Sequence, residues 1–216
     1  MSTVDTSSIA GRGRAIASPS PRAIALIKAV IFVLCLGPLV RLVGGAALDL
    51  LGVNPVELIR RSTGTWTLVF VLVTLSVTPL RRLTGWHWLA RLRRMFGLYA
   101  FFYAVLHLTS YVWLEQFFDV AAIVKDIIKR PFITIGFAAF AMMVPLAVTS
   151  TDKMVRRIGA KNWIALHRLV YALAICGVVH YWWLVKRDIT KPAIYALALA
   201  MLLGYRAVSA ARKRTP

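Results

Sequence analysis

Histidine is scarce in this chain, and most of its histidines stand inside long apolar runs. The sequence has four of them: His87 in GWHWL, His107 in YAVLHLTSY, His167 in WIALHRLVY and His180 in GVVHYWW. An ionisable side chain in hydrocarbon is costly, so one found there is usually functional. Imidazole is also a favoured axial ligand of haem iron. His107, His167 and His180 are therefore candidate haem ligands, whereas His87 is expected to be a surface residue.

The spacing of the three histidines indicates that they do not all serve one partner. On an ideal helix, the 13 residues from His167 to His180 correspond to about 19.5 Å and about 140° of rotation. Counted from the nearest basic residue, Lys161 or Arg94, His167 lies about 9 Å deep, His107 about 20 Å and His180 about 28 Å. The preferred axial pair is His107 with His180. His167 either ligates an inner haem alone or alternates as a ligand.

Two further roles for these histidines stay open. A helical histidine can simply form hydrogen bonds across a bundle. A transporter or channel could use histidines to relay protons or bind a metal ion, and helix-breaking residues such as Gly37–Pro38 and Pro145 occur in the chain. A proton relay normally recruits Asp or Glu, however. The apolar runs contain no carboxylate at mid-span, which favours haem ligation.

The elements that must position these residues are long apolar segments. The chain of 216 residues is 59% hydrophobic with a mean hydropathy of +0.71. Segments of about 20 residues suffice to cross a bilayer as helices. Six of them occupy residues 23–43, 64–80, 95–114, 131–149, 163–185 and 192–208. The sequence therefore predicts an all-α integral membrane protein, a six-helix transmembrane bundle.

Charge predicts how the bundle is oriented. The net charge is +19, but the basic residues form short clusters between apolar runs, so nucleic-acid binding is not expected. With a cytoplasmic N-terminus, 17 Lys and Arg lie on the cytoplasmic side and 9 outside. The seven tryptophans fall near the ends of the spans, as interfacial residues do. Both termini are therefore expected in the cytoplasm.

The predicted domain organisation is simple. Residues 1–22 are rich in Ser, Arg, Pro and Gly and are expected to form a disordered cytoplasmic tail. Residues 23–208 form one six-span domain, and residues 209–216 a basic cytoplasmic tail. The first span is expected to be retained rather than cleaved as part of a signal peptide. Cys35 and Cys176 lie in apolar runs and indicate neither a disulfide framework nor a zinc site.

Several long motifs resemble one known family over residues 26–207. The motifs are TLSVTPLRRLTG (74–85), RRMFGLYAFFYAVLHLTSYVWLE (93–115), KRPFITIGFAAF (129–140), PLAVTSTDKMVRRIGAKNWIALHRLVYA (145–172) and HYWWLVKRD (180–188). In them the chain resembles the MsrQ (YedZ) family, the haem-binding membrane subunits of a bacterial methionine sulfoxide reductase system. That family is similar in fold to ferric-reductase transmembrane domains.

The resemblance implies a function in electron transport. Members of the family take electrons from the quinone pool, or from a cytosolic flavin reductase, and pass them through haem b in the bacterial inner membrane. The acceptor is MsrP, a periplasmic molybdopterin enzyme that repairs oxidised proteins by reducing methionine sulfoxide, so the catalytic step lies in the partner subunit. The family's haem-iron ligands match His107, His167 and His180. The family is also described as binding FMN.

The basic residues near the histidines allow two interpretations each. Arg93 and Arg94 lie in a cytoplasmic loop, where they either set topology or bind a flavin phosphate or a quinone-proximal anion. Arg168 directly follows a proposed ligand and either meets a haem propionate or extends to the membrane surface. No flavin motif and no Gly-rich phosphate loop is present, so FMN rests on the resemblance alone.

Overall fold

A computed structural model describes residues 19–185 and 187–212. These residues form helices and short connections, with no strand among them, which confirms the all-α prediction. The helices are α1 (Pro21–Cys35), α2 (Gly37–Ala47), α3 (Pro55–Thr84), the 3₁₀-helix η1 (His87–Leu92), α4 (Arg93–Thr109), the π-helix η2 (Ser110–Glu115), α5 (Val120–Lys129), α6 (Pro131–Val148), α7 (Asp152–Ile158), α8 (Ala160–His167), α9 (Leu169–Leu184) and α10 (Thr190–Ala211).

Six helical stretches are long and apolar enough to cross a membrane, as predicted. They are Pro21–Ala47, Pro55–Thr84, His87–Glu115, Pro131–Val148, Ala160–Leu184 and Thr190–Ala211. Helix α1 begins two residues inside the expected N-terminal tail, and α10 extends three residues into the expected C-terminal tail. The rest of those tails, residues 1–18 and 213–216, lies outside the described residues. The chain is a multi-pass membrane protein.

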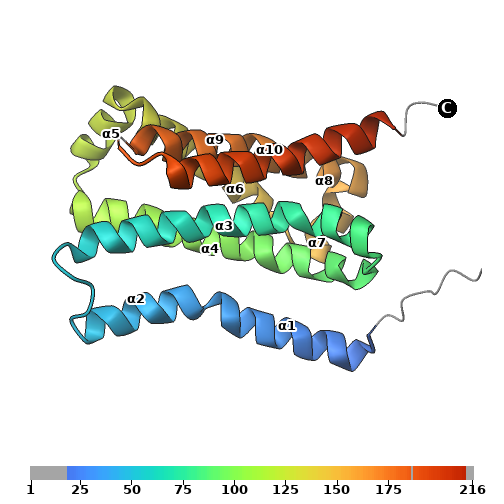
Figure 1. Cartoon of the computed structure of the whole chain (residues 1–216). Coiled ribbons are helices and arrows are strands. Elements are labelled where there is room, and N and C mark those ends of the chain that lie inside the picture. The colour runs from blue at the N-terminus through green and yellow to red at the C-terminus, as the bar shows by residue number, and fades with distance from the viewer. Residues whose placement is uncertain (1–18, 186, 213–216) are drawn as a thin grey trace, which may run out of the picture.

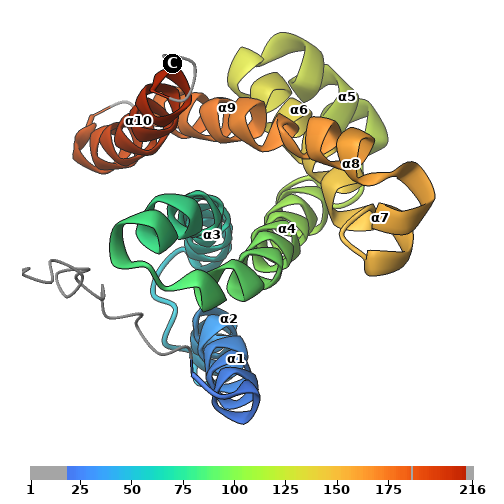
Figure 2. The same cartoon turned by 90° about the vertical axis from the view of Figure 1, so that its right-hand side faces the viewer.

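The spans form three layers (Figures 1 and 2). Helices α3 and α4 make the middle layer, α1 and α2 cover one side of it, and α6, α9 and α10 cover the other. The start of α1 and the end of α10 lie at the same end of the bundle (Figure 1). We call this the terminal end, and we call the opposite end, which holds α5, the far end.

The first span is interrupted, whereas the sequence indicated one unbroken segment. Helix α1 stops at Cys35 and α2 starts at Gly37, because Pro38 has no amide hydrogen to continue the helix. The hydroxyl of Tyr103 lies in the break. It donates to the carbonyl of Cys35 at 2.8 Å and accepts from the amide of Leu39 at 3.3 Å. A continuous helix would pair those two backbone groups with each other.

The third span combines three helix types. It begins as 3₁₀ in η1, continues as α4 and ends in the π-helix η2. A π-turn within a longer helix often marks a functional site, and this one begins three residues after His107. At its end, Glu115 forms an ion pair with Arg60 of α3. The far ends of α3 and α4 are thereby held together beside the histidine.

The fifth span also changes direction, next to a candidate ligand. Helix α8 ends at His167 and α9 begins at Leu169. The amide of Arg168 reaches back to the carbonyl of Ala165 at 3.2 Å, which is the tighter 3₁₀ pattern. The junction places His167 and Arg168 on the same cavity as Arg93, at the start of α4, and Arg206, near the end of α10.

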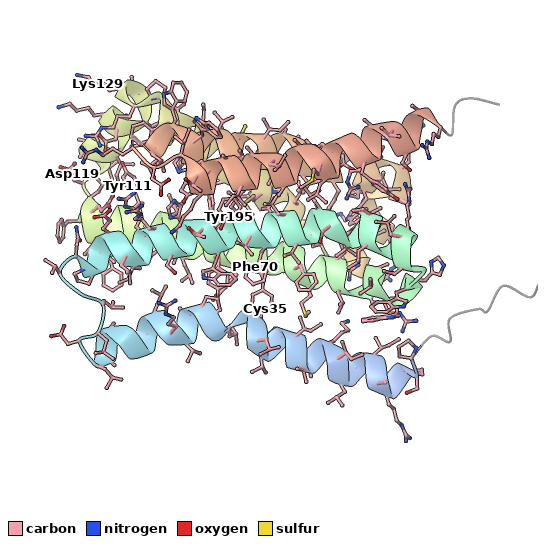
Figure 3. All side chains as sticks on the ribbon, in the orientation of Figure 1. Cys35, Phe70, Tyr111, Asp119, Lys129 and Tyr195 are labelled. Carbon is pink, nitrogen blue, oxygen red and sulfur yellow. The ribbon has the colours of Figure 1, made fainter. Side chains whose placement is uncertain are left out.

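Apolar burial is concentrated on the middle layer. The central cluster includes Phe70, Tyr99 and Tyr103, and the ring of Phe70 stacks on both tyrosines at 5.5 and 5.4 Å. Phe70 and Cys35 lie where the middle layer meets the first span (Figure 3). Many apolar side chains on the outside stay exposed, such as Leu34 and Ile194. Exposure of this kind is expected for helices that face lipid.

Candidate functional site

His107 and His180 come from different layers and meet between them. His107 lies on α4 and His180 on α9, 73 residues apart in the sequence. Their ring centroids are 6.3 Å apart and their ring planes are inclined at 73°. The structure therefore brings together the two histidines that the sequence analysis paired.

Each of the three intramembrane imidazoles forms a hydrogen bond between its Nδ1 atom and a backbone carbonyl. The partner is the carbonyl of Arg60 for His107 at 3.0 Å, of Phe132 for His180 at 2.6 Å, and of Trp163 for His167 at 3.0 Å. A carbonyl oxygen can only accept, so Nδ1 must carry the hydrogen. The other nitrogen, Nε2, then keeps its lone pair. A histidine bonded in this way is prepared to act as a metal ligand.

The distance between His107 and His180 fits one metal ion held between them. Two metal–nitrogen bonds of about 2 Å, with a ring radius of about 1.1 Å beyond each nitrogen, place ring centroids about 6 Å apart. The measured separation is 6.3 Å. The donor set is also suitable, since two neutral imidazoles are known axial ligands of haem iron. These residues fit a bis-imidazole haem.

His167 lies apart from that pair, against a cavity. The cavity has a volume of about 550 Å³, which is within the range of small-molecule and cofactor sites. We call it the terminal cavity. Its polar lining consists mainly of His167, Arg93, Arg94, Arg168, Tyr171 and Arg206. The Nε2 atom of His167 is buried and makes no hydrogen bond of normal geometry with the described residues.

The two predicted arginines of α4 behave differently. Arg94 forms an ion pair with Asp152 of α7 at 2.5 Å, and this guanidinium holds the pKa of the Asp152 carboxyl below its usual value. Arg93 has no carboxylate at ion-pair distance within the described part of the chain. Both side chains line the terminal cavity. Arg93 is therefore the better placed of the two to neutralise an anionic group there.

Arg168 and His87 are both exposed. Arg168 lines the terminal cavity from the junction of α8 and α9. Its position permits both interpretations that the sequence allowed, contact with an anionic group of a cofactor or extension to the membrane surface. His87 opens η1 at the terminal end, and its side chain faces outward.

Arg206 is a site residue that the sequence analysis counted only as a topology signal. It lies on α10, and its guanidinium donates to the carbonyl of Leu75 at 2.7 Å and to the hydroxyl of Tyr171 at 3.2 Å. Its carbon Cζ is 5.4 Å from the centroid of the Tyr171 ring. Its Nε is buried without a hydrogen bond in the described part of the protein. The signal in the sequence was an arginine five residues before the end of an apolar helix.

Comparison with known proteins identifies the family. The sequence pattern of the family described as "Ferric reductase like transmembrane component" matches residues 60–178, a range that holds His107 and His167 and ends two residues before His180. A protein from Azospira oryzae is 55% identical over 199 residues, covering 92% of this chain and 85% of its own. One from Herminiimonas arsenicoxydans is 52% identical over 199 residues, covering 91% of both chains.

A third relative, from Rhodospirillum rubrum, is 53% identical over 191 residues, covering 87% of this chain and 90% of its own. All three relatives carry the name "Protein-methionine-sulfoxide reductase heme-binding subunit MsrQ". Identity at this level over nearly the whole chain leaves no doubt about kinship. The chain belongs to the MsrQ family of heme-binding subunits, built on a ferric-reductase-like transmembrane component.

Proposed function

We propose that this protein holds haem b between His107 and His180 and carries electrons across the membrane for a methionine sulfoxide reductase system. The observation that carries the proposal is the 6.3 Å separation of the two imidazole centroids, with both Nδ1 atoms engaged by carbonyls. The names of the relatives, which specify a heme-binding subunit, support the same function.

The protein's own contribution is ligation, burial and orientation. A bound haem supplies a one-electron iron couple. The carbonyls of Arg60 and Phe132 fix the tautomer of the two imidazoles, and the ion pair of Arg60 with Glu115 closes the bundle beside them. None of these groups has to exchange a proton for an electron to pass, so we assign no catalytic residue to this chain.

We further propose that the terminal cavity takes a second planar redox cofactor that carries negative charge. A haem ligated by His167, or FMN with its phosphate near Arg93 and Arg94, has this chemistry. The unpartnered Nε2 of His167 and the convergence of arginines support such a ligand. The separation of His167 from the pair at the far side of the bundle argues against its replacing His107 or His180 as a ligand of the same iron.

The direction of electron flow follows from the orientation. We place the terminal end in the cytoplasm of a bacterial inner membrane, because most Lys and Arg lie there. Electrons then enter at the terminal cavity, from the quinone pool or a cytosolic flavin reductase. They leave from the haem toward the periplasm, where the proposed acceptor is the molybdopterin subunit MsrP. Sulfoxide reduction itself, and thus protein repair, takes place in that partner.

Haem counting on single variants tests this proposal. A pyridine haemochrome assay per mole of purified protein is done on wild type, His107→Ala, His180→Ala, His167→Ala and His87→Ala. We expect haem b in wild type and a lower haem content in His107→Ala and His180→Ala. The spectrum of the native protein, recorded before pyridine is added, should lose its low-spin bis-imidazole bands in these two variants, and His87→Ala should match wild type in both measurements. A folded, colourless wild-type protein from haem-replete cells would refute the function.

A further inference from the structure

Each imidazole of the His107–His180 pair lies directly against a glycine of a neighbouring helix. A Cβ atom added to Gly64 of α3 would be 3.0 Å from Cε1 and 3.1 Å from Nδ1 of His107. A Cβ added to Gly136 of α6 would be 2.7 Å from Nδ1 and 2.8 Å from Cε1 of His180. A methyl group at Gly136 therefore collides with the ring of His180, and one at Gly64 requires the ring of His107 to move by a few tenths of an ångström.

The same helical turn also provides the carbonyl that each ring contacts. Arg60 stands four residues before Gly64, and its carbonyl bonds to His107. Phe132 stands four residues before Gly136, and its carbonyl bonds to His180. Residues four apart lie one above the other on a helix. Two different helices thus present the same arrangement, a carbonyl with a glycine one turn later, to the two proposed ligands.

Other glycines inside the spans do not share this arrangement. A Cβ on Gly177 of α9 would meet only Leu68 at 3.6 Å, an ordinary contact, and one on Gly204 of α10 would meet nothing within 4 Å. Glycine costs about 1 kcal/mol relative to alanine inside a helix. Small residues also let transmembrane helices approach each other. At Gly64 and Gly136, however, the group that approaches is an imidazole rather than a helix backbone.

We propose that Gly64 and Gly136 are positioning residues for the axial ligands. By leaving out one methyl group, each glycine lets an imidazole lie on its helix with Nδ1–H on the carbonyl one turn earlier. The two glycines thereby set the angle between the ring planes, which is 73°. They also set how strongly each imidazole donates electrons to the iron. This inference rests on the proposed haem ligation by His107 and His180.

The arrangement has an electronic consequence. A hydrogen bond from Nδ1 to a carbonyl makes the imidazole a stronger electron donor, which favours ferric over ferrous iron. Displacing the ring weakens that bond, so the reduction potential of the haem rises. Outer-shell partners of this kind typically change metal affinity by about 10- to 100-fold. A changed ring orientation also changes the electron paramagnetic resonance spectrum of the low-spin ferric haem.

The test compares two pairs of variants of the full chain. Gly64→Ala and Gly136→Ala remove the space beside the ligands, whereas Gly177→Ala and Gly204→Ala add a methyl group where it is tolerated. Haem content, the spectrum of the oxidised haem and its midpoint potential are measured on each. We expect a shifted spectrum and a raised potential in the first pair, larger for Gly136→Ala because its contact is closer, and wild-type values in the second pair.

The outcomes separate this inference from the proposed function. Wild-type spectrum and potential in fully loaded Gly64→Ala and Gly136→Ala protein would overturn the inference but leave haem ligation intact. A wild-type protein without bis-imidazole haem would overturn the function itself. If a glycine variant fails to accumulate, the electron paramagnetic resonance spectrum of the oxidised wild-type protein tests the ring orientation instead. A highly anisotropic low-spin signal, typical of near-perpendicular imidazole planes, supports the inference, and one typical of parallel planes overturns it.

Discussion

At the scale of single residues, the three intramembrane histidines share one bonding pattern but differ in what surrounds Nε2. His107 and His180 have ring centroids 6.3 Å apart, so the Nε2 atom of each belongs to a ring with a second imidazole beside it. His167 has no second imidazole nearby among the described residues. Its ring stacks on Trp163 at 3.8 Å, and arginines stand across the cavity. A single donor among cations suits a cofactor that brings its own negative charge.

Replacing Arg206 tests whether the terminal cavity binds such a cofactor. Arg206→Gln removes a charge held by Leu75 and Tyr171 at the terminal cavity. Hydrogen bonds to charged groups contribute about 1.5–3 kcal/mol, so we expect about 10- to 100-fold weaker binding of an anionic cofactor there, measured by haem or flavin content after dilution. The haem proposed between His107 and His180 should remain.

Lys191→Gln is the matched control, because it removes an exposed charge at the other end of the same helix. It should leave both cofactor contents unchanged. Equal retention of cofactor in Arg206→Gln and wild type would show that Arg206 only holds α10 in place.

At the scale of elements, the interruptions of the spans have identifiable causes. The break between α1 and α2 follows from Pro38, and its unpaired backbone groups are satisfied by Tyr103 and by Tyr99, which donates to the carbonyl of Phe32 at 2.7 Å. Both tyrosines belong to α4, the helix that carries His107. The first span, which lies outside the residues matched to the ferric-reductase component, is thereby fixed to the helix that carries a proposed ligand.

Removing one hydroxyl should loosen that attachment. Tyr103→Phe leaves the carbonyl of Cys35 and the amide of Leu39 without their bridging partner in a fully buried position. We expect a loss of about 1–2 kcal/mol in the free energy of unfolding, seen as a lower denaturation midpoint in detergent. Tyr205→Phe, whose hydroxyl has no protein partner in the described residues, should change little, and an equal effect of both would contradict the bridging role.

Helix α5 is attached to the far end of the bundle through Asp126. The carboxylate of Asp126 belongs to a residue that is 9% exposed and accepts from Tyr111 and Gln116, each at 3.0 Å, while Arg130 lies 3.2 Å away. Tyr111 and the neighbouring Asp119 and Lys129 are visible at that end in Figure 3. In Asp126→Ala these donors lose their acceptor, so backbone amides of α5 should exchange hydrogen faster.

The control for α5 is Asp119→Ala, which removes only the exposed N-terminal cap of the same helix. It should affect the first turn alone. If Asp126→Ala left exchange throughout α5 unchanged, the buried carboxylate would not be what holds the helix.

At the scale of the whole molecule, the three layers place the His107–His180 pair and the terminal cavity near opposite ends of one bundle. Helices α4 and α9 each contribute to both sites, since α4 carries Arg93 and His107, and α9 carries Tyr171 and His180. The two proposed cofactor sites therefore lie at different depths along the bundle. Its function depends on which end faces the cytoplasm.

Labelling of single cysteines tests the orientation. Lys125→Cys on α5 and Arg156→Cys on α7 are both exposed positions, introduced separately after Cys35→Ala and Cys176→Ala. In intact spheroplasts, a membrane-impermeant maleimide should label the Lys125→Cys protein, and Arg156→Cys should react only after lysis. The reverse pattern would invert the topology and the direction of electron flow.

The sequence by itself determined the six spans, the all-α class and the three candidate ligands. The length of each apolar run, and the presence of a costly histidine inside it, are local properties that can be read directly from the sequence. The motifs around His107 and His167 were also enough to indicate the family. The spacing of His167 and His180 on one span further indicated that they point in different directions, because helix periodicity is fixed.

Only the tertiary structure decided which groups from different spans meet. The contacts of Gly64 with His107, of Gly136 with His180 and of Arg206 with Leu75 join residues 43, 44 and 131 positions apart. The periodicity of the sequence cannot predict these contacts, because they depend on how the helices rotate and pack against one another. The break at Leu36 was likewise visible in the sequence only as a glycine and a proline, and its repair by Tyr103 required the fold.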